Sequence, residues 1–148
     1  MDLSFHLHAP ADRVYAHLAE PGLFAAAHPL IERMDPLPGG RVRARERMMI
    51  GPWRTPFRFG YTATVEAEPA ARTVRMSASV LGLAHLHFTF RVEPEGSSSL
   101  VRERAEVRSP LPIQRLMHGI IRTQHAILFA NIERACQARE PLRDGRRA

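Results

Sequence analysis

Hydrophobic and polar residues alternate along most of the chain between residues 3 and 107. The pattern has a period of two, which is typical of strands with one buried face. Turn residues such as Pro38-Gly39-Gly40, Gly51-Pro52 and Glu95-Gly96 separate the alternating segments. The sequence therefore predicts an antiparallel meander, with strands at residues 3–8, 30–37, 41–50, 57–66, 73–80, 85–92 and 100–108.

The period changes to three or four residues in two places. Residues 10–20 form one short amphipathic segment, Pro21-Gly22 interrupts it, and residues 23–28 allow a second short helix. From Ser109 to about Arg139 a much longer helix is predicted, with Ser109 as its cap and a length of about 40 Å. Its apolar residues recur three and four apart at Ile113, Leu116, Met117, Ile120, Ile127, Leu128 and Ile132.

This order of elements predicts an α+β fold. Only the C-terminal helix is large enough to cover the apolar face of the sheet. We expect a helix-grip arrangement, with a curved antiparallel sheet of six to seven strands around the long helix and two short helices after the first strand. Residues 1–139 form the single predicted domain, and residues 140–148 are a flexible polar tail. A curved sheet that grips one helix leaves space for a cavity.

Two amide side chains fall within the apolar stripe of the long helix. At 100° per residue from Ile120, the stripe is centred near about 40°, with Gln124 at its centre and Asn131 about 20° away. A buried amide without partners costs about 1 to 3 kcal/mol. Gln124 and Asn131 therefore belong to an internal polar network or to a cavity wall. Phe129 lies opposite the stripe, where it would be an exposed contact for a homodimer.

Two carboxylates share strand faces with apolar neighbours. Glu46 lies between Ala44 and Met48, and Glu103 lies between Val101 and Ala105, so alternation points both inward. A cavity carboxylate with a raised pKa can act as a general base or accept a hydrogen bond from a ligand. Alternatively, a bulge turns both carboxylates outward, or Arg54, Arg58 or Arg134 neutralises them.

Other residues are candidates for the cavity wall. Tyr61 continues the face of Phe57 and Phe59 and can aim its hydroxyl toward Gln124, although such a tyrosine is also a common core residue. Trp53 follows Gly51-Pro52 at a hairpin tip, where it either gates a ligand or packs on the helix. The apolar lining that we expect consists of Phe59, Phe88, Met117 and Ile120.

A resemblance to a known family rests on the first part of the chain. The first strand is followed by Ala9-Pro10, by Val14-Tyr15 and Leu18, and then by a short helix interrupted by proline, a strand meander and a closing helix. In the order of these elements the chain resembles the START-like superfamily, also called SRPBCC. That superfamily includes lipid-transfer domains, pollen-allergen-type carriers, coenzyme Q-binding proteins and polyketide cyclase/aromatases. The resemblance implies a hydrophobic ligand tunnel, and it transfers no catalytic residue to this chain.

The charge balance does not establish a nucleic-acid partner. The chain has 21 basic and 15 acidic residues, and every basic residue is arginine. Arg41, Arg43, Arg45 and Arg47 form an outward row without the interleaved aromatic residues that stack on bases. We interpret this row as solvated surface and consider nucleic acid an unlikely partner.

Metal and cofactor motifs are missing from the sequence. Cys136 is the only cysteine, and the pairs His6/His8 and His85/His87 lie on different predicted strands without a third ligand. There is no glycine-rich phosphate loop and no nucleophile elbow. We therefore expect no metal and no cofactor. The N-terminal residues resemble neither a signal peptide nor a membrane span, which favours a cytoplasmic protein.

Three functions follow as hypotheses. The first is binding or transport of a hydrophobic small molecule, such as a lipid, an isoprenoid or a polyketide-like compound, between sheet and helix. The second is an enzyme, a cyclase/aromatase or dehydratase that uses a cavity carboxylate. The third is a basic module associated with RNA or the ribosome.

Overall fold

A computed structural model describes residues 1–138 of the protein. The predicted order of elements is confirmed. The elements are β1 (Asp2–Leu7), α1 (Ala11–Ala19), α2 (Pro21–Ala27), β2 (Ile31–Pro36), β3 (Arg41–Ile50), β4 (Thr55–Glu68), β5 (Thr73–Val80), β6 (Ala84–Glu95), β7 (Ser98–Arg108) and α3 (Gln114–Ala138). The predicted tail at residues 140–148 lies outside the described residues.

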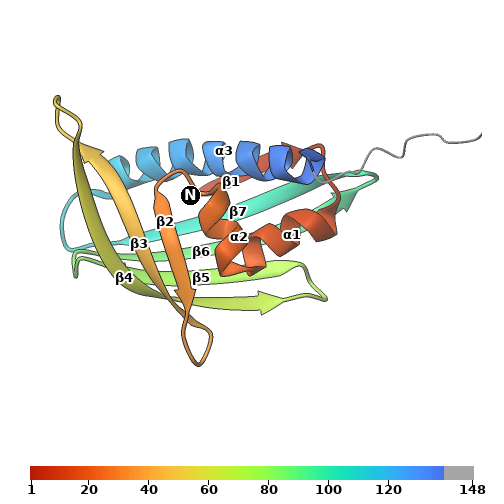
Figure 1. Ribbon diagram of the computed structural model, residues 1–148, viewed down its shortest axis with the longest axis horizontal. Helices are drawn as coiled ribbons and strands as arrows, with labels where there is room; N and C mark the ends of the chain where they lie inside the picture. The colour runs from red at the N-terminus through yellow and green to blue at the C-terminus, as the bar shows by residue number, and fades with distance from the viewer. Residues whose placement is uncertain (139–148) are drawn as a thin grey trace, which may run out of the picture.

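All seven strands form one antiparallel sheet in the order β1-β7-β6-β5-β4-β3-β2. Each of the strands β2 to β7 pairs with its neighbours in the chain, whereas β1 pairs with the last strand, so that Leu3 lies opposite Glu103. The sheet curves around α3, and α1 and α2 lie across the same side of it (Figure 1). This is the expected helix-grip fold.

The long helix begins later than the sequence predicts. α3 starts at Gln114 and runs for 25 residues. Ser109 does not cap it: its Oγ donates a hydrogen bond to the carbonyl of Leu83 at 2.6 Å and accepts one from the amide of Leu111 at 3.1 Å. Ser109 therefore ties the β7–α3 connection to the β5–β6 turn.

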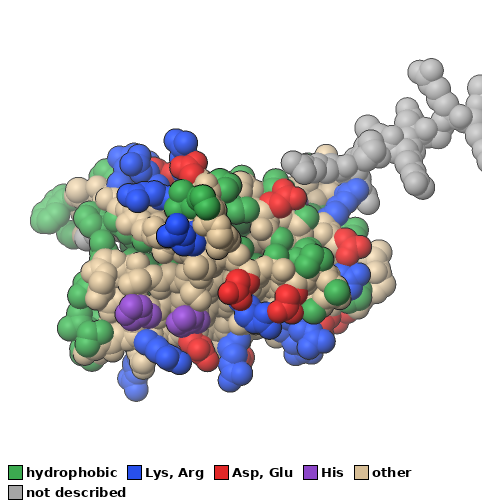
Figure 2. Space-filling view, turned by 90° about the horizontal axis from the view of Figure 1, so that it is seen from below, with side chains coloured by type: hydrophobic (Ala, Val, Ile, Leu, Met, Phe, Trp, Pro, Cys, Tyr) green, Lys and Arg blue, Asp and Glu red, His purple; other side chains and the backbone are tan. Residues whose placement is uncertain are grey.

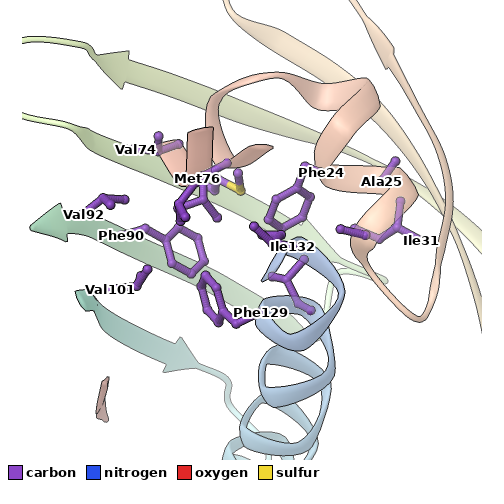
Figure 3. Close-up of a cluster of buried hydrophobic side chains, with 14 of the residues drawn as sticks. Phe24, Ala25, Ile31, Val74, Met76, Phe90, Val92, Val101, Phe129 and Ile132 are labelled. Carbon is purple, nitrogen blue, oxygen red and sulfur yellow. The ribbon is translucent and has the colours of Figure 1, made fainter. Parts of the chain in front are cut away.

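The main core lies under the C-terminal half of α3. Phe90, Phe129 and Ile132 face one another between sheet and helix, next to Phe24 of α2 (Figure 3). The Phe129 ring centroid lies 4.5 Å from that of Phe5 and 6.0 Å from that of Phe90. Phe129 is 2% exposed. The prediction that it is exposed was wrong, and it offers no contact to a second copy.

The buried face of α3 is rotated relative to the predicted stripe. It consists of Ile121, His125, Leu128, Phe129, Ile132 and Cys136. At 100° per residue its centre lies about 90° from the predicted one. Leu116 and Ile127, which helped to define the predicted stripe, are 64% and 40% exposed. The predicted face was therefore wrong, because it was centred partly on apolar side chains that are exposed rather than packed against the sheet.

Two strand connections at the same end of the molecule contain strained backbone. In the β5–β6 turn, Leu81 has φ 54° and Gly82 has φ 63°, and the amide of Leu83 donates to the carbonyl of Val80 at 3.0 Å. A leucine in this left-handed conformation costs about 1 to 2 kcal/mol. In the β3–β4 turn, Gly51 and Arg54 also have positive φ. Both turns place apolar side chains at the surface.

Candidate ligand cavity

A cavity of about 310 Å³ lies between the sheet and the N-terminal half of α3. This volume is near the lower end of the range for small-molecule sites. The strands contribute inward-facing residues, because alternate positions along each strand face the helix. The lining is Phe24, His28, Leu30, Ile31, Met34, Glu46, Met48, Phe57, Phe59, Tyr61, Ala63, Val65, Met76, Ser77, Ala78, Val80, Leu81, Leu83, Ala84, Leu86, Phe88, Ile113, Met117, Ile120, Ile121, Gln124 and His125.

Glu46 and Tyr61 form a polar pair in this largely apolar wall. They face each other from β3 and β4, and the Tyr61 hydroxyl donates a hydrogen bond to Glu46 Oε1 at 2.7 Å. Burial raises the pKa of Glu46, although the hydrogen bond from Tyr61 and the charge of His125 partly oppose that rise. Burial, followed by the neighbouring Glu46, also raises the pKa of Tyr61. The pair therefore favours protonated, hydrogen-bonding forms.

His28 brings a neutral imidazole to the cavity. It follows α2 directly, and its Nδ1 accepts hydrogen bonds from the amides of Leu30 and Ile31, both at 3.2 Å. A ring nitrogen that accepts from amides carries no proton, so the proton of the neutral ring is on Nε2. Burial, with a smaller contribution from the charge of His125, lowers the pKa of His28 to about 3.

His125 and Glu103 form a second pair, at the floor of the cavity. His125 Nδ1 lies 2.5 Å from Glu103 Oε1, and the two residues are 4% and 2% exposed. Glu103 Oε2 is buried and has no hydrogen-bond partner among residues 1–138. Glu103 occupies the Nδ1 side of the imidazole, so Nε2 is the nitrogen that His125 has available for a molecule in the cavity.

Gln124 is the third polar element of the wall. Its Oε1 is buried and has no hydrogen-bond partner in the described part of the chain. Buried polar atoms in proteins are nearly always paired, and an unpaired one costs about 1 to 3 kcal/mol. Because Gln124 also lines the cavity, a ligand or a water molecule there can supply the missing partner.

Most of the site residues predicted from the sequence are part of the cavity wall. Seven of them line it: Glu46, Phe59, Tyr61, Phe88, Met117, Ile120 and Gln124. Alternation along the strands placed Glu46 and Tyr61 correctly on the inner face. Whether these residues bind a ligand stays a prediction.

Three predicted residues do not line the cavity. Trp53 is 86% exposed at the β3–β4 turn. Glu103 lies behind His125. Asn131 lies beyond the cavity, where its Nδ2 donates to the carbonyl of Ala27 at 2.8 Å and its Oδ1 accepts from Arg134. The amide of Asn131 is therefore hydrogen-bonded within the protein and is not part of the cavity wall.

Two of the three arginines proposed to neutralise the carboxylates bind elsewhere. Arg58 pairs with Glu32 on the surface at 3.1 Å, and Arg134 binds Asn131. Glu46 is instead partnered by a tyrosine and Glu103 by a histidine. No arginine is among the residues that line the cavity. The wall is thus polar at a few points and carries no permanent positive charge.

Two cavity residues, His28 and His125, are not among those predicted from the sequence. His28 follows the second short helix and precedes Pro29, a position with no signal of burial. His125 had one: Ile121, His125, Phe129, Ile132 and Cys136 are spaced four, four, three and four apart, which is the spacing of one helix face. The predicted stripe consisted of Ile, Leu and Met alone, so it left out His125, Phe129 and Cys136.

Metal-ligand clusters and membrane-spanning helices are both absent from the described residues. No three of their His, Cys, Asp or Glu side chains are grouped so that they could hold a metal ion. None of the helices in residues 1–138 is long and apolar enough to cross a membrane.

Comparisons with known proteins agree with the fold. None of the curated proteins matches the sequence. Among solved structures, the di-domain ARO/CYC protein BexL from the BE-7585A biosynthetic pathway is 25% identical, with a TM-score of 0.74 over 90% of this chain. The match spans 46% of BexL, so this chain is about half its length.

Two other solved structures cover nearly the whole chain. The Zhui aromatase/cyclase from Streptomyces sp. R1128 has a TM-score of 0.72 and 13% identity, with 98% of this chain and 97% of that one covered. A START superfamily protein from Mycobacterium smegmatis has a TM-score of 0.73 and 12% identity, with 93% and 97% covered. These two similarities concern the fold alone. A sequence profile described as polyketide cyclase / dehydrase and lipid transport matches residues 1–133, and the chain therefore belongs to that family.

Proposed function

We propose that this protein is a cytoplasmic binding protein for a hydrophobic small molecule with one polar end, of the lipid, isoprenoid or polyketide-like kind. The observation that carries the proposal is the cavity of about 310 Å³, whose wall is apolar except for a few hydrogen-bonding groups. Burial of apolar ligand surface contributes about 25 cal/mol per Å². Family membership supports a hydrophobic ligand in general terms.

The polar groups define the end of the ligand that they recognise. Glu46, Tyr61, His28 and Gln124 supply donors and one unpaired acceptor, and none of them carries a positive charge at neutral pH. Such a wall suits a hydroxyl or carbonyl group and disfavours a carboxylate or phosphate, because the one cation that the described residues of the wall could offer, His125, is already paired with Glu103 and an anion buried without a counter-charge is costly. The ligand is therefore a neutral alcohol, phenol or ketone with an apolar body.

Native mass spectrometry of the freshly purified protein, followed by solvent extraction, tests this function. We expect an apolar adduct in the wild type. Ala78→Phe places a ring in the cavity wall and should eliminate the adduct. Ala126→Phe makes the same substitution on an exposed position of α3 and should keep it. A folded wild type that carries no adduct and binds no apolar fluorescent probe would contradict the proposal.

A second candidate function is favoured by the pairing of an acid and a base at one cavity. Environments that separate the pKa values of neighbouring groups are typical of acid–base catalysis. Here Glu46 is biased toward its protonated form, while Glu103 orients His125 with Nε2 available. In an aldol cyclisation, His125 removes a proton next to one carbonyl, the resulting enolate attacks a second carbonyl, and Glu46 protonates the new alkoxide.

Hydrogen exchange on a simple ketone tests the base without knowledge of the substrate. With 2-acetonaphthone in heavy water, we expect the protein to accelerate exchange of the methyl protons. His125→Gln should reduce that acceleration by about 100-fold or more, and Glu46→Gln should reduce it little, because the acid acts only in the later step. Equal exchange rates with wild type and His125→Gln would exclude this base.

A further inference from the structure

Exposed hydrophobic side chains gather at the end of the molecule where the cavity opens. In the described part of the chain, eight large apolar side chains are exposed, and all but Ile127 lie in, or within three residues of, the β3–β4, β5–β6 and β7–α3 connections. Figure 2 shows hydrophobic side chains gathered at the left, the end that carries these connections in Figure 1. We call this set the mouth surface: Met49, Trp53, Phe57, Leu81, Leu83, Leu111 and Leu116.

The mouth surface consists of protruding tips. Trp53 lies at the apex of the β3–β4 turn, which is closed by a hydrogen bond from the amide of Arg54 to the carbonyl of Gly51 at 3.1 Å, and it is 86% exposed. Leu81, at the apex of the β5–β6 turn, is 54% exposed despite its left-handed backbone. Asparagine or aspartate suits such a position better. An apolar residue in a strained, exposed position points to a function outside the fold itself.

The same end is positively charged. Residues 47–58, 80–86 and 107–117 contain five arginines and no acidic residue. Arg47 and Arg58 share Glu32 of β2, at 3.9 and 3.1 Å. No ion pair with a described residue is found for the other three, Arg54, Arg108 and Arg115, which are all exposed. Apolar tips among unbalanced arginines match the chemistry of an anionic lipid surface.

We propose that the mouth surface binds an anionic lipid bilayer, with the tips inserted between headgroups and the arginines on the phosphates. Three separate tips offer no groove for a peptide or a helix, whereas a fluid surface accommodates each tip independently. An exposed tryptophan with an apolar body and one N–H donor suits the membrane interface. The charge excludes a second copy as the natural partner, because two such ends repel each other.

The mouth surface is continuous with the cavity. Phe57, Leu81 and Leu83 are exposed and also line the cavity wall. A ligand leaving the bilayer along these side chains would reach the cavity without crossing water. The inference extends the proposed function by naming the surface that supplies or receives the ligand. Vesicle binding is measured without added ligand. A failure to bind vesicles therefore contradicts the membrane proposal alone, and a failure to bind a ligand contradicts the proposed function alone.

Trp53 is the only tryptophan of the chain, so intrinsic fluorescence reports on the tip itself. The full-length protein is mixed with vesicles of phosphatidylcholine alone, and with vesicles that also contain phosphatidylglycerol at about one part in four. We expect a blue shift of the emission and co-flotation with the anionic vesicles. Binding should fall by about tenfold or more on neutral vesicles and at about 0.5 M salt.

Paired variants separate the apolar and the charged contributions. Leu81→Asn with Leu83→Thr suits the turn, so the variant is expected to fold, and it should weaken binding to anionic vesicles by about fivefold to tenfold. Arg54→Glu with Arg115→Glu should weaken it by about tenfold or more on anionic vesicles only. Ile127→Ser removes the exposed apolar residue outside the mouth surface and should leave binding within about twofold of wild type.

Several results would overturn the proposal. One is a wild type that neither floats with anionic vesicles nor shifts its emission. Another is binding that Ile127→Ser weakens as much as the leucine variant does, since that would make the attraction unspecific. Self-association without lipid that the leucine variant abolishes would assign the surface to a second copy instead. Tighter binding to a short RNA than to vesicles, reduced by the Arg54/Arg115 variant, would support the RNA-associated alternative.

Discussion

The two halves of α3 contact the same sheet in different ways. Toward its C-terminus, Leu128, Phe129, Ile132 and Cys136 are all 2% exposed or less and pack against strands and short helices. Toward its N-terminus, Met117 and Ile120, like Ile113 just before the helix, are only partly buried and line the cavity. One helix therefore both closes a packed core and forms the wall of a binding site.

The polar groups of the site lie where these two regions meet. His125 contacts the core rings of Phe88 and Phe90 at centroid distances of 5.1 and 5.7 Å, and it also lines the cavity. A histidine held by packed neighbours keeps its orientation, while an adjacent space admits a ligand. The comparison suggests that the packed half provides the stability and the hollow half provides the function.

The largest expected difference between the two halves of α3 is in the free energy of unfolding that is lost when a side chain is truncated. Phe129→Ala removes a fully packed ring and should lower the free energy of unfolding by about 3 to 5 kcal/mol. Met117→Ala enlarges an existing cavity, so we expect a loss below about 1.5 kcal/mol. Chemical denaturation measures both. Similar losses for the two variants would show that the hollow half is as tightly packed as the core.

Acid should destabilise the protein through His28. Its pKa is about 3 in the folded state and 6.5 in a model peptide, so between these values only the unfolded state binds the proton. Stability is therefore lost as the pH falls through that window, by about 2 kcal/mol at pH 5 relative to pH 7. Glu46, whose pKa is raised, acts in the opposite direction, because its proton binds first to the folded state.

The variant His28→Asn isolates this contribution. The asparagine oxygen can accept the amide hydrogen bonds that His28 Nδ1 accepts, and it does not titrate. Denaturation at pH 7 and at pH 5 should show a smaller difference in the variant than in the wild type. An unchanged difference would assign the acid sensitivity to other groups.

Relief of backbone strain at the mouth should stabilise the fold. Leu81→Asn places a residue that tolerates positive φ in the β5–β6 turn and should raise the free energy of unfolding by about 1 kcal/mol. Thermal denaturation checks the gain. Leu86→Asn, made on a partly buried position of β6, should destabilise the protein instead. A destabilised Leu81→Asn would mean that the leucine contributes packing that outweighs the strain.

The smallest expected effect lies in the hollow half of α3. Gly119 is helical, and a Cβ added there meets no atom within 4 Å. Gly119→Ala should therefore stabilise the protein by about 0.5 kcal/mol through reduced flexibility of the unfolded chain. Ligand or vesicle binding that changes with this variant would indicate that the first turns of α3 must bend for function.

The fold was predictable because strand alternation is a local signal. Val42, Ala44 and Glu46 face inward and the arginines between them outward, as their spacing predicts. The buried face of α3 was not predictable from apolar content alone, because the apolar Leu116 is exposed in the mouth surface whereas the polar His125 is buried. Glu103 and His125 are 22 positions apart in the sequence. They meet only because α3 packs across β7 in the folded protein, which no local pattern indicates.

The position of β1 affects how this chain folds. Leu3 pairs with Glu103, a separation of 100 residues, so β1 has no partner until β7, the last strand of the sheet, has been made. Long-range pairing of this kind slows folding. Until β7 and α3 emerge, the inner faces of the earlier strands stay open to solvent. Chains in which this pairing has not yet formed therefore expose apolar surface, which favours aggregation at that stage of folding.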